Sequence, residues 1–110
     1  MAPQLLQINY RFNGTRVDFE REFGPLAAGI AKVPGLRWKI WLIDEAASRG
    51  GGTYLFADEA SLRAYLDGPI VAALKSHPAF SELSVRAFAV MEGPTAVTRG
   101  PIEGGGSSCG

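Results

Sequence analysis

The sequence has little of the side-chain chemistry on which many enzymes depend. Its 110 residues contain one histidine, His77, and one cysteine, Cys109. A single cysteine excludes an internal disulfide framework. One histidine without a spaced group of acidic residues or cysteines does not form the pattern of a metal-ligand set. We therefore expect no metal site.

Net charge and long apolar runs are missing as well. Eleven basic and eleven acidic residues cancel, so no overall field attracts nucleic acid. No apolar run approaches the roughly 20 residues that cross a bilayer. The N-terminus lacks the basic region and apolar core of a signal peptide. We expect a cytoplasmic protein that binds neither nucleic acid nor membranes.

What the sequence contains is the composition of one globular domain, with 46% hydrophobic and 20% charged residues. Four stretches alternate with the period of two that is typical of strands. They are residues 5–12, 36–43, 53–57 and 83–91. The polar, glycine-rich residues 44–52 are predicted to form a long, mobile hairpin loop.

Two helical regions separate these strands. Apolar residues three and four positions apart predict a helix over residues 16–32, with a kink near Pro25 because proline removes a helical N–H. A second region begins after Asp58, a good N-cap, and restarts at Pro69. The order β-α-β-β-α-β is that of a ferredoxin-like α+β fold, in which both helices cover one face of a four-stranded antiparallel sheet. Residues 1–94 form this domain, and residues 95–110, rich in Gly, Pro, Ser and Thr, are predicted to be a flexible tail.

Such a fold leaves the other face of the sheet bare, and a bare apolar face is most simply covered by a second copy of the chain. We expect a homodimer. The strand at residues 36–43 carries Trp38 on one side, and Lys39 and Trp41 on the other. We assume that the more apolar sides, those with Tyr10, Trp38 and Leu55, face the helices. Lys39 and Trp41 are then left for the dimer interface.

Two arginines of the predicted sheet have two interpretations. Arg11 and Arg86 lie on the first and last predicted strands. They could hold an anionic substrate, or pair with carboxylates at the dimer interface. We prefer the interface.

Several motifs resemble those of the YdhR-like monooxygenase family, a branch of the dimeric α/β-barrel superfamily. They are LLQINYRFNG at the first strand, P-G-L-x-W-K-x-W from Pro34 to Trp41, G-G-x-Y-L-F from Gly51 to Phe56, and A-Y-L at residues 64–66. The resemblance implies a homodimer in which two sheets form a barrel, with a ligand cavity inside each subunit. It also implies likeness to small oxygenases that act on phenolic polyketides without metal, flavin or haem.

Oxygenation without a cofactor needs a dry aromatic pocket for an electron-rich phenol, and a polar group that stabilises its anion and moves a proton. Tyr10, Trp38, Tyr54 and Tyr65 are the candidates for substrate binding. Trp38 and His77 are the candidate catalytic residues, although His77 also suits a helix C-cap. We therefore predict a cofactor-independent monooxygenase for a small aromatic or polyketide-like substrate. The alternative is a non-oxidative binding protein, cyclase or isomerase that uses the same pocket.

Overall fold

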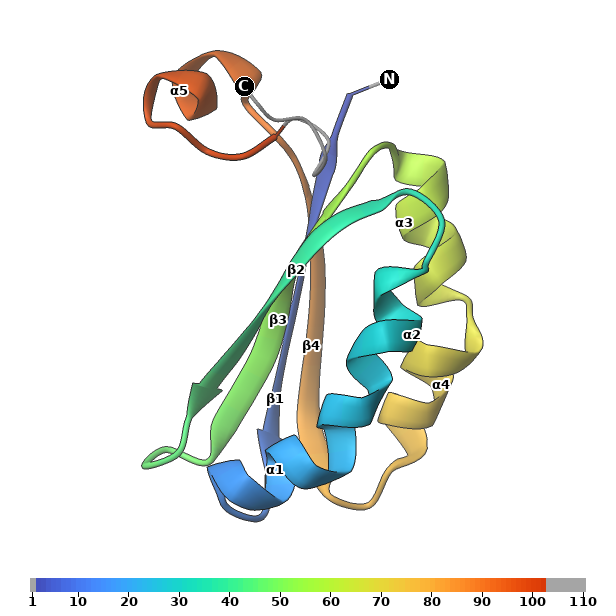
Figure 1. Ribbon diagram of the computed structural model, residues 1–110, viewed down its shortest axis with the longest axis vertical. Coiled ribbons are helices and arrows are strands. Elements are labelled where there is room, and N and C mark those ends of the chain that lie inside the picture. The colour runs from blue at the N-terminus through green and yellow to red at the C-terminus, as the bar shows by residue number, and fades with distance from the viewer. Residues whose placement is uncertain (1, 103–110) are drawn as a thin grey trace.

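The computed structural model describes residues 2–102, which form a four-stranded antiparallel sheet with helices on one face (Figure 1). The elements, in chain order, are β1 (Gln4–Phe12), α1 (Arg16–Phe23), the 3-10 turn η1 (Gly24–Leu26), α2 (Ala27–Ala31), β2 (Leu36–Asp44), β3 (Arg49–Phe56), α3 (Glu59–Leu66), α4 (Pro69–Ser76), β4 (Phe80–Ala89) and α5 (Glu92–Val97). The strands lie in the order β2-β3-β1-β4. This confirms the predicted ferredoxin-like arrangement. None of the described helices has the length and apolar character to cross a membrane.

The core lies between the sheet and helices α1 to α4. Along β1 the alternate side chains are buried, and they are Leu6, Ile8, Tyr10 and Phe12. Leu62 and Tyr65 of α3 and Val71 of α4 pack against them. The side of β1 that was predicted to face the helices therefore does so.

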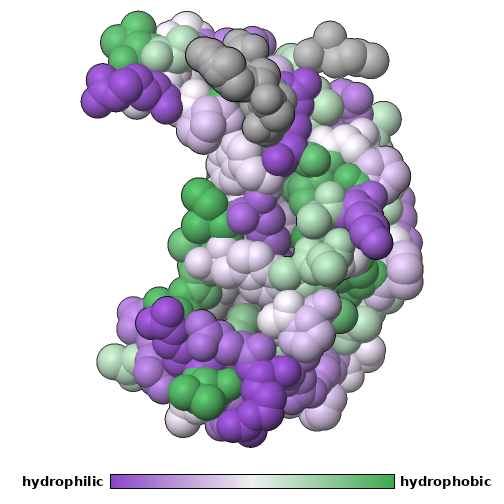
Figure 2. All heavy atoms as spheres, viewed as in Figure 1, coloured by the Kyte–Doolittle hydropathy of each residue, from purple (hydrophilic) through white to green (hydrophobic). Residues whose placement is uncertain are grey.

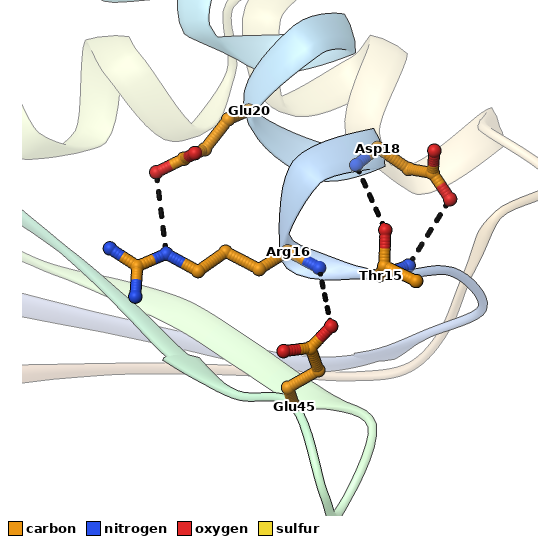
Figure 3. Close-up of polar contacts among 5 residues, drawn as sticks. All are labelled: Thr15, Arg16, Asp18, Glu20 and Glu45. Atoms are coloured by element: carbon orange, nitrogen blue, oxygen red, sulfur yellow. Dashed lines mark hydrogen bonds and ion pairs between the residues drawn. The ribbon is translucent and has the colours of Figure 1, made fainter.

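The first helix begins with a capping box, and a side chain of the β2–β3 turn binds the same end of the helix (Figure 3). Thr15 Oγ1 accepts from the Asp18 N–H at 3.1 Å, and the Asp18 carboxylate accepts from the Thr15 N–H at 3.3 Å. Glu45 in the turn accepts from the Arg16 N–H at 2.9 Å. The predicted interruption at Pro25 is confirmed, because η1 separates α1 from α2 there.

The connection between β2 and β3 is shorter than predicted. Asp44 ends β2 and Arg49 begins β3. The triglycine segment (residues 50–52) pairs with β1 on one side and β2 on the other. The prediction of a long, mobile loop over residues 44–52 is therefore wrong. Glycine is accepted in this central strand because other atoms approach its backbone closely, as the ring of Tyr10 does at Gly50.

An irregularity in β2 decides which of its side chains face the helices. The register with β3 shifts between Leu36, which pairs with Phe56, and Trp38, which pairs with Leu55. Arg37 is thus an extra residue, and an extra residue inverts the alternation of all the side chains beyond it. Leu36 packs against the core. The assumption that Trp38 faces the helices is therefore wrong.

Beyond this bulge, the two sides of β2 are exchanged relative to the prediction. Lys39 and Trp41 face the helices, beside Tyr54. Trp38 lies on the opposite face with Leu55, and both were expected on the helix side. The assignment of Lys39 and Trp41 to the dimer interface is therefore corrected.

The face of the sheet away from the helices, called the open face below, carries both predicted interface arginines. Arg11 lies between the buried Tyr10 and Phe12 and so points the other way. Arg86 pairs with Gln7 of β1, whose two neighbours are buried on the helix side. Exposed apolar side chains accompany them, with Ile40 52%, Leu42 41% and Phe88 49% exposed. Figure 2 shows that the molecule is hollowed between α5 and the β2–β3 turn. The homodimer stays a prediction.

The chain after β4 is ordered beyond the predicted boundary at residue 94. Helix α5 follows β4 directly, and the backbone then returns to the open face. Trp38 Nε1 donates to the carbonyl oxygen of Pro101 at 2.7 Å, and an Arg37 guanidinium N–H donates to that of Ile102 at 3.0 Å. Residues 95–102, predicted as part of the tail, therefore belong to the folded domain. The rest of that predicted tail, with Cys109, lies outside the described residues.

Candidate functional site

A cavity of about 190 Å³ lies between the sheet and the helices. The strands contribute Tyr10, Lys39, Trp41 and Tyr54 to its wall. The helices and their ends contribute mostly apolar side chains, among them Phe19, Phe23, Tyr65, Ile70, Leu74 and His77. This space can hold an aromatic ring among aromatic rings, with few polar groups to orient it.

The triglycine segment makes room for this cavity. A Cβ at Gly50 would lie 3.0 Å from the ring of Tyr10. A Cβ at Gly52 would lie 2.7 Å from Lys39 Cε and 3.2 Å from the ring of Tyr54. Side chains at these two positions would therefore displace the residues that form the sheet side of the cavity.

Two tyrosine hydroxyls meet in the cavity wall. The Tyr65 hydroxyl donates to the Tyr54 hydroxyl at 3.2 Å, and the two side chains are buried. Burial raises the pKa of Tyr54, of Tyr65 and of the nearby Tyr10, and Tyr65 adds to the rise in pKa at the other two. All three phenols are therefore protonated at neutral pH. The proton of Tyr65 is donated to Tyr54, so the hydroxyls of Tyr54 and Tyr10 are the ones that can donate to a ligand.

Lys39 brings a positive charge to the same wall. Its Nζ lies 3.5 Å from the ring centroid of Trp41 and 4.6 Å from that of Tyr54, so that both rings make cation–π contacts. Burial lowers the pKa of Lys39 to about 8. The sequence pattern does not indicate this role, because strict alternation places Lys39 on the other side of the strand.

His77 also lines the cavity, but both of its ring nitrogens are occupied. Nδ1 accepts from the Ala79 N–H at 3.0 Å, so the proton of the neutral ring is on Nε2, 3.1 Å from the Glu22 carboxylate. The ring packs edge-on against Phe23 and Phe80. His77 is the C-cap residue of α4, which agrees with its structural interpretation. Proton transfer by His77 stays a prediction, and it would require the bond to Glu22 to be exchanged.

Of the predicted site residues, the structure brings Tyr10, Tyr54, Tyr65 and His77 together around the cavity. It places Trp38 on the far side of the sheet, in a hollow between the open face and the segment that follows α5. The predicted position of Trp38 in the cavity is therefore wrong. Among residues 2–102, no three His, Cys, Asp or Glu side chains gather in a group that could hold a metal ion.

A protein-family model described as "Putative mono-oxygenase ydhR" matches residues 5–101. The chain belongs to this family. The resemblance carried by the sequence motifs is thereby confirmed, and the family match extends past the predicted domain boundary at residue 94. No curated protein matches the chain.

Several solved structures share the fold of this family member. A protein of unknown function from Nitrosomonas europaea has a TM-score of 0.69 at 22% identity, over 83% of this chain and 91% of that chain. SnoaB, a cofactor-independent oxygenase from Streptomyces nogalater, has a TM-score of 0.66 at 18% identity, over 84% of this chain and 96% of its own. The heme-degrader MhuD from Mycobacterium tuberculosis, with two hemes bound in its active site, has a TM-score of 0.61 at 22% identity, over 79% and 95%. At identities below 25%, these TM-scores establish a common fold.

The donors in the cavity of this chain do not fit haem. Haem iron takes an axial His, Cys, Met or Tyr ligand. His77 has both ring nitrogens engaged, and burial keeps the cavity tyrosines protonated. The described part of the cavity wall contains no Cys or Met. A volume of about 190 Å³ is also below the roughly 300–1,000 Å³ of pockets for drug-sized ligands.

Proposed function

We propose that this protein is a cofactor-independent monooxygenase that acts on a small aromatic substrate bound between the sheet and the helices. The aromatic-walled cavity with its tyrosine donors carries the proposal. Membership of a family described as mono-oxygenases supports the reaction class. The shared fold of SnoaB, a cofactor-independent oxygenase, supports catalysis without a bound cofactor.

The size of the cavity favours a substrate with one ring. An engineered apolar cavity of about 150 Å³ is known to bind benzene, and the cavity here is slightly larger, at about 190 Å³. A fused three-ring compound would have to extend out of it. A monocyclic phenol or hydroquinone is the substrate that the volume supports best.

An electron-rich phenol can supply all the electrons that monooxygenation requires. A hydroquinone and O₂ give a hydroxyquinone and water: one oxygen atom enters the ring, the other leaves as water, and the substrate loses the four electrons that O₂ gains. Tyr54 would donate a hydrogen bond to the substrate oxygen, and Tyr65 would orient that hydroxyl through its own bond to Tyr54. The apolar wall would exclude water and so strengthen both bonds. His77 is the candidate proton carrier.

The test is to incubate metal-free protein with hydroquinone under ¹⁸O₂ and to measure oxygen uptake and product mass. We expect one ¹⁸O atom in each hydroxyquinone, whereas spontaneous oxidation gives quinone and hydrogen peroxide without insertion. Tyr54→Phe removes the donor to the substrate and should lower the rate by at least about tenfold. Tyr65→Phe removes the bond that orients this donor and should also lower the rate. Arg63→Gln, on the exposed side of the helix that carries Tyr65, is the matched control and should keep the rate. Bound ligand or turnover without ¹⁸O insertion would instead support a non-oxidative binding protein, cyclase or isomerase.

A further inference from the structure

We infer that the cavity binds an aromatic anion and that Lys39 pairs with its negative charge. The inference rests on the proposed binding of a small aromatic substrate in this cavity, and it adds the charge of that substrate.

The first observation is the surroundings of the Lys39 ammonium. Nζ lies over the rings of Trp41 and Tyr54, and the side chain is half-buried. None of the ion pairs formed within residues 2–102 includes Lys39. Ring faces compensate a buried cation only in part. A carboxylate or phenolate in the cavity would supply the missing counter-charge.

The second observation is how the ammonium is positioned. The stem of Lys39 crosses the sheet beside Gly52, where an added Cβ would lie 2.7 Å from Lys39 Cε. Trp41 and Tyr54 flank the end of the chain. The ammonium is therefore held at the cavity wall before any ligand arrives, which lowers the entropic cost of pairing.

The third observation is the charge of the other groups around Lys39. From β1, β3 and α3, Tyr10, Tyr54 and Tyr65 present neutral phenols, because burial raises the pKa of each. At the end of α4, His77 is bound to Glu22 of α1. On β2 itself, the Arg37 guanidinium donates to the carbonyl oxygen of Ile102. The ammonium of Lys39 is thus the charge that faces a ligand in this cavity.

The pH dependence of binding follows from the same burial. Burial lowers the pKa of Lys39 to about 8, so that the ammonium predominates at pH 7 and is lost as the pH rises through that value. A benzoate carboxylate is ionised throughout this range. Affinity for an aromatic carboxylate should therefore fall above pH 8, while affinity for a neutral ligand of the same shape should not.

The experiment compares benzoate with benzamide, which have nearly the same shape and differ in charge. Calorimetric titration of the wild-type protein at pH 7 should give at least about tenfold tighter binding of benzoate, as expected for a charge-assisted contact. That ratio should decrease at pH 9.5. Lys39→Met keeps an apolar stem without the charge, and should abolish the preference for benzoate over benzamide. Lys32→Met removes the same charge from an exposed position at the end of α2 and should keep the preference.

Equal affinities of the wild-type protein for benzoate and benzamide would overturn the inference, as would no binding of either at millimolar concentration, or a preference that survives in Lys39→Met. If Lys39→Met does not fold, the wild-type ratio and its change with pH decide. The comparison of benzoate and benzamide affinities does not depend on whether ¹⁸O is inserted into hydroquinone. A preference for benzoate without insertion would overturn the proposed oxygenation alone, and insertion without the preference would overturn the anion site alone.

Discussion

Two neighbouring glycines of β3 should respond very differently to the same substitution. A Cβ at Gly52 would meet Lys39 Cε at 2.7 Å, and this atom is the far end of a flexible side chain that can move. A Cβ at Gly51 would collide with the carbonyl oxygen of Ile8. That oxygen belongs to the backbone of the central strand β1, where Asn9 pairs with Gly51. We therefore expect Gly51→Ala to damage the fold and Gly52→Ala to damage the cavity.

The magnitudes follow from the atoms that must move. Alanine in place of glycine inside a strand gains about 0.5–1 kcal/mol. Overpacking costs about 1–3 kcal/mol, and a sheet hydrogen bond lost when β1 shifts costs about 1 kcal/mol more. For Gly51→Ala the net loss is about 2 kcal/mol, or roughly 10 °C in Tm for a domain of this size. For Gly52→Ala the lysine moves instead, and Tm should stay within about 4 °C of the wild-type value.

Thermal unfolding followed by circular dichroism measures both changes, and benzoate titration of Gly52→Ala measures the effect on Lys39. We expect Gly52→Ala to remain folded and to bind benzoate more weakly, because the displaced ammonium no longer lies at the cavity wall. A Tm of Gly52→Ala as low as that of Gly51→Ala, or a wild-type Tm for Gly51→Ala, would refute the reasoning about backbone and side-chain neighbours.

Two further predictions concern β2. Trp38→Phe removes the donor to the Pro101 carbonyl oxygen. It should lower the free energy of unfolding by about 0.5–1.5 kcal/mol and speed proteolysis of residues 92–102, whereas Trp41→Phe should change benzoate affinity. The reverse pattern would contradict the bulge in β2. Since burial lowers the pKa of Lys39 from 10.5 to about 8, the unfolded chain binds more protons between these values. The free energy of unfolding, from urea titrations between pH 7.5 and pH 10, should therefore rise with pH relative to Lys39→Met. A difference that does not change with pH would argue against a buried ammonium.

Much of the fold could be predicted from the sequence because it depends on local signals. The break at Pro25 follows from the missing N–H of proline. The start of α3 follows from Asp58, whose Oδ1 accepts from the Ser61 N–H at 2.8 Å. The alternation along β1 placed Tyr10 correctly, because β1 pairs on both sides and its helix-facing side chains are all apolar. Each of these signals depends on a few neighbouring residues.

The β2–β3 hairpin shows where local signals fail. Glycine is normally unfavourable inside a strand, so local signals predict a loop for the triglycine segment. It lies in β3 because the Tyr10 ring, the Lys39 stem and the β1 backbone occupy the space where side chains would otherwise stand. Glycine is therefore favoured at residues 50–52 by the packing of three strands, which the local sequence does not indicate.

The sequence by itself determined the order of the elements and the antiparallel sheet with helices on one face, and the family resemblance implied a cavity between the sheet and the helices. The tertiary structure decided which side of β2 meets that cavity. One extra residue at Arg37 exchanges the two sides of the strand, so that Lys39 faces the cavity and Trp38 binds the backbone at Pro101. The physical reason is that a bulge arises from pairing with the neighbouring strand. The alternating pattern of β2 does not indicate where the register of that pairing shifts.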